Sequence, residues 1–266
     1  MIGSIVIKLK PLGEIKVTGH GGENLYKLVL NILNEKDEHI AREVHDSKKV
    51  ELVTVSPLLK GVKSTHGHTY LNPFQSASFR VTYLKEELVG PLINGFLLFS
   101  DKAEPLPFSS GEVLIDKVDW QKGNNSIFTS FEEIFSCAQT EKTIALEFCS
   151  PTLFYSRRKE KLFPIPKLVF SSLLKKWEAF SEIEIPSNIG EELKKIRVTQ
   201  FRLKTEHVHF SEQTIPGFMG KVWYELEEEF SKETKKALNA LGNFAFYSGI
   251  GYKTSLGMGQ VRRTKE

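Results

Sequence analysis

GIGYKTSLGMGQVRR, residues 249–263, places four glycines and three basic residues within fifteen positions. The stretch follows a helical pattern and leads into a strand pattern, which is the reverse of the order in a dinucleotide-binding fingerprint. No Gly-Lys-Ser or Gly-Lys-Thr closes a phosphate-binding loop. The pattern thus argues against a nucleotide cofactor. Two interpretations stay open: the glycines end a helix and form a tight turn, or their bare backbone N–H groups approach a phosphate.

The chain alternates strand and helix patterns twice in the same order. Residues 3–9 alternate as a strand, with Ile5, Ile7 and Leu9 on one face, and apolar residues at helical spacing follow at 25–33. The first half adds strands at 50–56, 76–84 and 111–120, a short helix at 38–44, and a helix at 85–97 that Pro91 is expected to cut or fray. The second half repeats the order, with strands at 142–150, 195–210, 217–226 and 257–263 and helices at 166–181 and 233–248.

Strand, helix, strand, strand, helix, strand is the order of the ferredoxin-like unit. The sequence therefore predicts an α+β fold of two tandem ferredoxin-like (βαββαβ) units, at residues 1–122 and 140–266, with residues 121–141 as the linker. A chain of 266 residues with 40% apolar content can bury cores of this size.

Composition narrows the class of protein further. No run of eighteen apolar residues is present, and the N-terminal MIGSIVIKLKPLG is too short and too alternating for a signal peptide, so we expect a cytoplasmic protein. Cys137 and Cys149 have no matching histidine spacing, which argues against a disulfide framework or a zinc site. We expect both cysteines to be small buried apolar groups.

Four stretches, taken together and in order, carry a resemblance to a known family. They are the glycine spacing at 249–259, TVSPLLKG (54–61), the segment at 150–180, and GFMGKVWYEL (217–226). This combination resembles the Cas-six family of CRISPR repeat-processing endoribonucleases, in the RAMP superfamily. The resemblance implies a partner, CRISPR repeat RNA (pre-crRNA), and a single cut without metal or cofactor. It also implies that a ribose 2′-OH attacks the adjacent phosphate and leaves a 2′,3′-cyclic phosphate and a 5′-OH.

Such a reaction needs proton transfer and positive charge near the phosphate. The family usually places a histidine just before the second strand of the first unit, and His45 stands there, with His39 as the second choice. The tyrosine that some members carry on the first helix corresponds to Leu30 or Asn31, although Tyr26 and Lys27 lie one turn earlier. Glu51 stands where a lysine is expected. Lys27 is therefore one candidate for the charge, and Lys48 or Lys49 would have to replace the expected lysine, with ordinary solvated lysines as the alternative.

RNA contact is predicted for the second unit, because phosphates attract Arg and Lys and unpaired bases stack on aromatic rings. The glycine stretch is expected to approach the RNA backbone closely, with basic residues around it. The predicted RNA-binding residues are Gly249, Gly251, Lys253, Gly257, Gly259, Arg157, Arg158, Lys159, Arg262 and Arg263.

The histidine pairs His66/His68 and His207/His209 raise the question of a metal site. No Asp, Glu or Cys pattern completes a ligand set, so no metal is predicted. A non-catalytic RAMP subunit that holds RNA beside other subunits of a CRISPR interference complex is the main alternative function. A ferredoxin-like scaffold without nucleic acid is a third.

Overall fold

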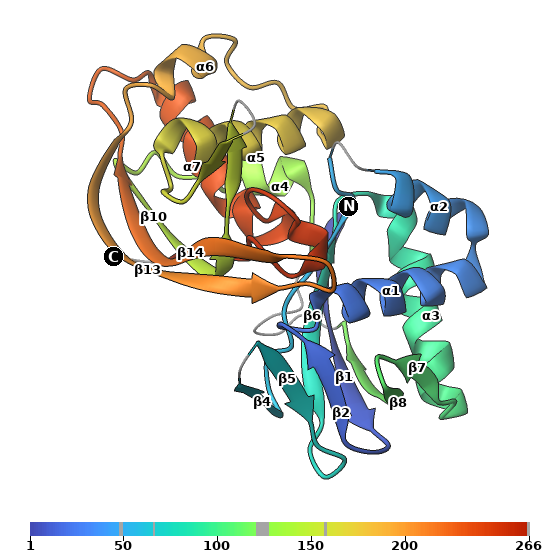
Figure 1. Ribbon diagram of the computed structural model, residues 1–266. Helices are drawn as coiled ribbons and strands as arrows, with labels where there is room; N and C mark the ends of the chain where they lie inside the picture. The colour runs from blue at the N-terminus through green and yellow to red at the C-terminus, as the bar shows by residue number, and fades with distance from the viewer. Residues whose placement is uncertain (48–49, 66, 121–127, 157–158, 265–266) are drawn as a thin grey trace. The chain divides into compact units, whose positions relative to one another are not determined.

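The computed structural model describes residues 1–47, 50–65, 67–120, 128–156 and 159–264. Three predicted site residues, Lys48, Arg157 and Arg158, lie outside these ranges. The chain divides into two compact units, each built from separate stretches of the chain (Figure 1). The first comprises Met1–Phe128, His207–Ile215 and Ser255–Gly257, and the second comprises Thr129–Glu206, Pro216–Thr254 and Met258–Glu266.

The central sheet of the first unit is antiparallel and runs in the order β3-β6-β1-β8-β7. Alternation along β1 buries Ile5, Ile7 and Leu9 completely, as the period-2 pattern predicts. The helices α1 and α3 pack against each other, and α3 packs on β8. The strands are β1 (Ile2–Pro11), β3 (Val53–Val55), β6 (Ala77–Tyr83), β7 (Leu106–Phe108) and β8 (Gly111–Asp119), and the helices are α1 (Gly22–Lys36), α2 (Glu38–Asp46) and α3 (Val89–Lys102).

The second unit repeats this arrangement with the sheet order β13-β14-β10-β15. In each main sheet the first strand, β1 or β10, pairs on one side with β8 or β15 and on the other with β6 or β14, which is the ferredoxin-like order. The predicted fold class is therefore confirmed. The elements are β10 (Thr143–Thr152), β11 (Phe154–Ser156), β12 (Lys159–Lys161), α5 (Pro166–Phe180), α6 (Ile189–Glu192), β13 (Arg197–His209), β14 (Thr214–Glu225), α7 (Lys232–Ser248), a short 3-10 turn η2 (Thr254–Leu256) and β15 (Val261–Thr264).

A small three-stranded sheet in the first unit was not predicted. It consists of β2 (Ile15–Thr18), β5 (His68–Leu71) and β4 (Val62–Thr65), in the order β2-β5-β4. The strands are only four residues long and rich in polar side chains, so their alternation is too short to stand out in the sequence.

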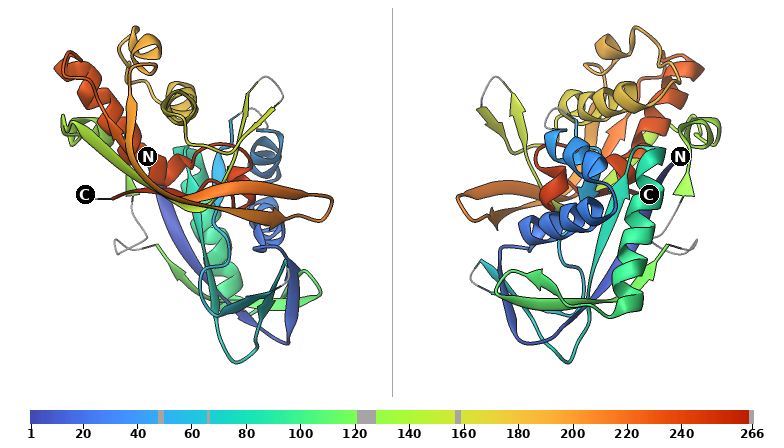
Figure 2. Two further views of the ribbon diagram at one scale, coloured as in Figure 1. Left: turned by 60° about the vertical axis from the view of Figure 1, so that its left-hand side comes forward. Right: turned by 90° about the vertical axis from the view of Figure 1, so that its right-hand side faces the viewer.

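Three local expectations were wrong. Pro91 does not cut its helix, because it lies in the first turn of α3, where no backbone N–H bond is lost; Figure 2 shows α3 as one uninterrupted helix. The predicted linker contains β9 (Phe128–Thr129) and the helix α4 (Phe131–Ser136), and the Phe131 ring packs edge-on against Trp177 at 5.1 Å between ring centres. Cys137 and Cys149 are both exposed rather than buried.

A helix that crosses a bilayer must be long and predominantly apolar. In the part of the chain that the structure describes, no helix combines the length and the apolar character needed to cross a membrane.

Candidate functional site

The end of α2 carries the predicted catalytic histidine. Asp37 ends α1 and begins α2, and its side chain accepts a hydrogen bond from the Ile40 N–H at 3.0 Å, which caps the second helix. His45 was expected in a loop, but α2 continues to Asp46, so His45 lies in the last turn of the helix. Its side chain is exposed, because the neighbouring Val44 is the residue that α2 turns toward the core. His45 is thus held on a helix and open to solvent.

Tyr26 connects α1 with this turn. Its hydroxyl donates to the Val44 carbonyl oxygen at 3.3 Å, one residue before His45. Burial, and secondarily the negative charge of Glu51, raises the pKa of Tyr26 to about 12, so the phenol stays neutral at physiological pH. In the sequence, Tyr26 lies one helical turn before the position at which the resemblance places a tyrosine. Only the packing of α1 against α2 could reveal that its hydroxyl reaches the end of α2.

The other candidates near His45 differ in exposure. Lys27 is exposed on α1, and Lys48 lies outside the described residues. His39 is exposed on α2, but six residues of helix rotate the chain by about 600°, which leaves His39 and His45 about 120° apart around the axis. Glu51 is half-buried. The structure therefore brings His45 and Tyr26 to one helix end and turns His39 to another side.

The glycine loop, defined as residues 249–259, is mostly internal. Gly249, Gly257 and Gly259 are buried, and Gly251 is half-buried. Three of the four glycine amides donate to protein acceptors: Gly249 to the Ala245 carbonyl at 3.0 Å, Gly251 to Ser172 Oγ at 3.1 Å and Gly259 to the Pro151 carbonyl at 3.0 Å. These three amides are occupied within the second unit.

Gly259 shows why the loop needs a residue without a side chain. Its φ is +66°, and a Cβ at this position would lie 2.1 Å from the Ile250 carbonyl oxygen. The Ile250 N–H donates a hydrogen bond to the Gly259 carbonyl oxygen at 2.9 Å, which holds the backbone of Ile250 against the backbone of Gly259. The glycine therefore allows two segments of the loop to close on each other.

A buried lysine, Lys176, is hydrogen-bonded to the glycine loop and to the end of the helix before it. Lys176 of α5 is only 4% exposed, and its Nζ donates to the Ser248 carbonyl oxygen at 2.6 Å and to Thr254 Oγ1 at 2.9 Å. Its ammonium thereby satisfies a carbonyl at the C-terminus of α7, where the helix dipole favours positive charge.

The two arginines of β15 have different environments. The Arg262 side chain is 60% exposed and pairs with Glu147 at 2.7 Å, a hydrogen bond that raises the pKa of the guanidinium. The Arg263 side chain is 17% exposed, and burial lowers its pKa, opposed by the Glu141 carboxylate. Arg263 also donates to the Asn243 side-chain oxygen at 2.9 Å and to Asn239. Arg263 thus faces the interior of the unit, and Arg262 faces solvent.

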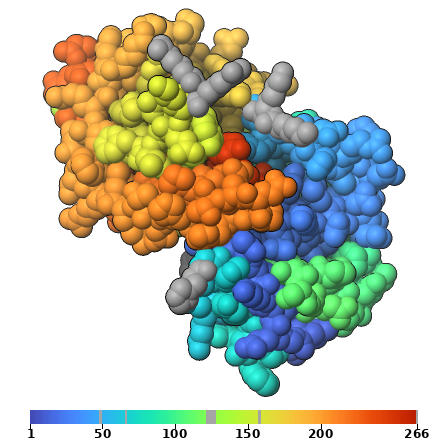
Figure 3. All heavy atoms as spheres, in the orientation of Figure 1, coloured from blue at the N-terminus to red at the C-terminus, as the bar shows by residue number. Residues whose placement is uncertain are grey.

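Aromatic and basic side chains lie on the surface of the second unit. Tyr155 of β11 and Tyr252 of the glycine loop meet edge to face at 4.9 Å between ring centres, and both are exposed. The Lys253 ammonium lies 5.6 Å from the centre of the Tyr252 ring, and Lys159 is exposed on β12. In Figure 3 the β13–β14 hairpin, drawn in orange, also presents its side chains at the surface.

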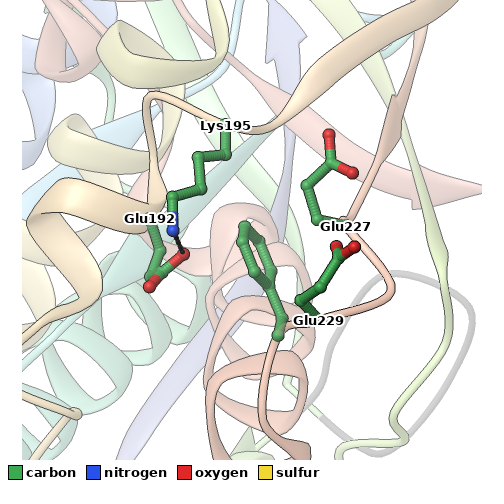
Figure 4. A pocket seen from close by; sticks show the side chains of 5 residues that line it. Glu192, Lys195, Glu227 and Glu229 are labelled. Carbon is green, nitrogen blue, oxygen red and sulfur yellow. Dashed lines mark ion pairs between the residues drawn. The ribbon is translucent and has the colours of Figure 1, made fainter.

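A cavity in the second unit is lined mainly by carboxylates, which repel a polyanion such as RNA. It measures about 450 Å³ and is lined by Glu192, Lys195, Glu227, Glu229 and Phe230 (Figure 4). Lys195 pairs with Glu192 at 3.0 Å and Arg197 pairs with Glu227 at 3.3 Å, so the three lining carboxylates still outnumber the two cations that pair with them. Phosphate repulsion makes this cavity unsuitable for RNA. None of the predicted site residues lines it.

The paired histidines of the sequence do not form a metal site in the described ranges. Within the described ranges, no group of three or more His, Cys, Asp or Glu side chains is placed to hold a metal ion. His68, His207 and His209 line a cavity of the first unit, described below, and His66 lies outside the described residues.

The sequence of the second unit is similar to that of known proteins. Residues 146–261 match the family model of the CRISPR-associated endoribonuclease Cas6, a range that holds the whole glycine loop. The predicted resemblance to Cas6 is confirmed. A Cas6 from Streptococcus thermophilus is 33% identical over 133 residues, which are 49% of this chain and 54% of that protein. A Cas6 from Mycobacterium tuberculosis is 30% identical over 50% of this chain and 43% of its own length. The chain matches about half the length of these relatives.

Solved Cas6 structures match over nearly the whole chain. The product complex of Cas6 (TTHB231), a Thermus thermophilus protein, has a TM-score of 0.82 at 24% identity and covers 99% of this chain and 100% of its own, which shows the fold. The product complex of Cas6 (TTHA0078) has a TM-score of 0.76 at 27% identity and covers 99% of each chain. A further structure of TTHA0078, 25% identical with a TM-score of 0.72, is a histidine-to-alanine mutant. The fold likeness thus includes residues 1–128 of the first unit, which the family model does not reach.

Proposed function

We propose that the chain is a metal-independent endoribonuclease that cuts CRISPR repeat RNA (pre-crRNA) to mature crRNA. The observation that carries the proposal is His45, an exposed histidine held in the last turn of α2 within a Cas6 fold. The similar proteins from S. thermophilus and M. tuberculosis are named endoribonucleases, which supports the reaction class.

The proposed chemistry is a transesterification within the RNA. A base removes the proton of a ribose 2′-OH, the 2′ oxygen bonds to the adjacent phosphorus, and the bond from phosphorus to the 5′ oxygen breaks. That 5′ oxygen takes up a proton, and the products carry a 2′,3′-cyclic phosphate and a 5′-OH. Histidine suits these proton transfers because its ordinary pKa is near neutrality, and His45 is the residue assigned to them.

Positive charge must stabilise the phosphorane-like transition state. Lys27, exposed on α1, and Lys48 are the residues proposed for this role. The Tyr26 hydroxyl donates its proton to the Val44 carbonyl oxygen, so its part is to hold the last turn of α2 that carries His45.

Binding of the repeat RNA is proposed for the glycine loop and its surroundings. Lys253, Lys159 and Arg262 offer exposed or half-exposed cations, and Tyr155 and Tyr252 offer ring faces to unpaired bases. Arg157 and Arg158 are proposed as further phosphate contacts from sequence alone. Gly249, Gly251, Gly257 and Gly259 contribute through the shape of the loop rather than through free amides.

The test is incubation of the full chain with repeat RNA in EDTA, for the wild type and His45→Ala. The proposal expects cleavage by the wild type, a cyclic phosphate on the upstream product, and loss of cleavage with retained RNA binding in the variant. Binding without cleavage by the wild type would instead support a non-catalytic RAMP subunit of an interference complex. Unchanged cleavage by His45→Ala would move the chemistry to another residue, with His39→Ala as the next variant to measure.

A further inference from the structure

A small cavity in the first unit collects four of the seven histidines of the chain. It has a volume of about 200 Å³ and is lined by Gly19, His20, Ser64, Thr65, Gly67, His68, His207 and His209. All of these residues belong to the first unit, and none is among the residues proposed for catalysis. The cavity therefore calls for a separate explanation.

Three separate stretches of the chain build this histidine cavity. The small sheet provides β4 and β5, residues 19–20 connect β2 to α1, and the end of β13 supplies His207 and His209. Gly19 N–H donates to the Gly67 carbonyl at 2.8 Å, and Thr69 Oγ1 donates to the Gly19 carbonyl at 2.6 Å. The walls are thus fixed by hydrogen bonds.

Two glycines let His209 close against the sheet. Gly19 and Gly67 have φ values of +57° and +76°. A Cβ on Gly19 would lie 2.1 Å from the His209 carbonyl oxygen, and a Cβ on Gly67 would lie 2.7 Å from the His209 ring. The histidine is therefore built into the cavity wall, and its Nδ1 lies 3.0 Å from Thr214 Oγ1.

The chemistry of the lining favours an anion over a metal ion. Imidazole N–H groups and the Thr65 hydroxyl are hydrogen-bond donors, and no carboxylate or thiolate is among the described residues of the lining. The Ser64 hydroxyl instead donates to Thr69 Oγ1 at 2.9 Å, because the Thr69 proton is given to the Gly19 carbonyl. The His68 Nδ1 atom is buried and has no hydrogen-bond partner in the described structure, so it can serve a ligand. No metal-holding group of three ligands occurs in the described ranges.

The helix that starts beside the cavity adds positive potential. His20 lies two residues before the first residue of the fifteen-residue helix α1, whose N-terminal N–H groups and dipole favour negative charge. The acid in the first turn, Glu23, accepts from the Ser211 N–H at 2.9 Å and from Ser211 Oγ at 3.1 Å, so its carboxylate is bound to the β13–β14 turn. The volume is below the range of ordinary small-molecule sites and suits a single phosphate group.

We propose that the histidine cavity binds one backbone phosphate of the RNA, as a positioning contact separate from the cleavage centre. The inference rests on the proposed function for the identity of the ligand. The cavity donors fix the register of the strand on the first unit, as phosphate contacts do in other nucleic-acid complexes.

The direct test observes the imidazole rings of the wild-type chain by ¹H–¹⁵N NMR, with signals assigned through single substitutions. Inorganic phosphate, and separately dimethyl phosphate, is added at constant ionic strength. The signals of His68, His207 and His209 are expected to shift along one saturating curve, while the exposed His39 stays unchanged. Equal shifts of all histidines, or no saturation, would overturn the proposal. Zn²⁺ that saturates these same rings at micromolar concentration and displaces phosphate would also overturn it, in favour of a metal site.

The second test measures RNA affinity in the His45→Ala background, so that the RNA is not consumed. The double variant His68→Ala/His207→Ala is expected to bind repeat RNA about 3- to 10-fold more weakly at constant salt, because hydrogen bonds to one phosphate are lost. The control, Gln75→Ala, changes an exposed uncharged residue of the same unit and should leave the affinity unchanged.

The two tests separate this proposal from the proposed function. If the wild type neither binds nor cuts repeat RNA, the proposed function fails, and the phosphate titration still decides whether the cavity binds anions. If the wild type cuts RNA while the double variant binds repeat RNA as tightly as its His45→Ala parent, the cavity proposal alone fails.

Discussion

The glycine loop of the second unit is largely buried and hydrogen-bonded, whereas the end of α2 in the first unit is exposed and carries His45. The loop holds the residues by which the family is most easily identified, and most of their backbone groups are engaged inside the protein. The end of α2 has little sequence signature, yet it offers a titratable group to solvent. The comparison teaches that a diagnostic motif can mark how a unit is packed, while the proposed chemistry lies on an inconspicuous helix end.

The strongest way to sharpen this comparison is His45→Ala. If the proposed function is correct, the single-turnover cleavage rate falls about 10²- to 10⁴-fold, because proton transfer is lost. The free energy of unfolding should change by no more than about 0.5 kcal/mol, since the side chain is exposed. Quench-flow kinetics and urea unfolding of the same sample measure the two quantities. A large loss of stability in His45→Ala would show that the end of α2, like the glycine loop, is part of the packed interior.

The converse change is Gly259→Ala. The added Cβ would meet the Ile250 carbonyl oxygen at 2.1 Å, at a φ of +66° that disfavours alanine, and we expect a loss of about 2–4 kcal/mol in unfolding free energy. RNA affinity should fall only as far as the fold is lost. The matched control is Gly190→Ala, where nothing lies within 4 Å of an added Cβ. Urea unfolding of both variants should show a clear loss for position 259 alone.

The neighbouring arginines repeat the comparison within one strand. Arg263→Leu removes hydrogen bonds to Asn239 and Asn243 and should cost about 2 kcal/mol of unfolding free energy. Arg262→Leu removes an exposed pair with Glu147 and should cost at most about 1 kcal/mol, while it weakens RNA binding if the proposed surface is correct. Equal destabilisation by the two substitutions would contradict the assignment of Arg263 to the interior.

The prediction confined to the narrowest range of conditions concerns Tyr26 at alkaline pH. Its folded-state pKa of about 12 exceeds its ordinary value of 10.0, so the neutral phenol stabilises the fold fully below about pH 10, and this stabilisation is lost as the pH rises toward 12. Tyr26→Phe removes the titrating group and should flatten that part of the profile. Unfolding free energy measured from pH 9 to pH 12 for both proteins checks this, and parallel profiles would show that Tyr26 does not titrate in this window.

Sequence periodicity predicted the elements that bury one clear face. Ile5, Ile7 and Leu9 on β1 and the apolar stripe of α1 belong to this group, because burial repeats at the period of the element. The small sheet escaped prediction since each strand has only four residues, too few to show a clear period. Pro91 misled because a proline breaks a helix only beyond its first turn.

The candidate site was predictable in part. Its histidine could be selected through the resemblance, but the extent of α2 depends on packing that brings Val44 into the core. The hydrogen bond from Tyr26 to Val44 joins residues eighteen positions apart, and the histidine cavity joins His20 with His209. Contacts of this kind arise from tertiary structure, so no local pattern contains them.

The single residue Asp37, which ends α1 and caps α2, leaves no spare chain between the two helices. His45 lies eight residues beyond this joint, or about 12 Å along the helix. One inserted residue within α2 before His45 would rotate the histidine by about 100° and move it about 1.5 Å along the axis. The joint therefore makes this short segment intolerant of insertions and deletions, and length here should vary much less among functional variants than in the nearby surface turns.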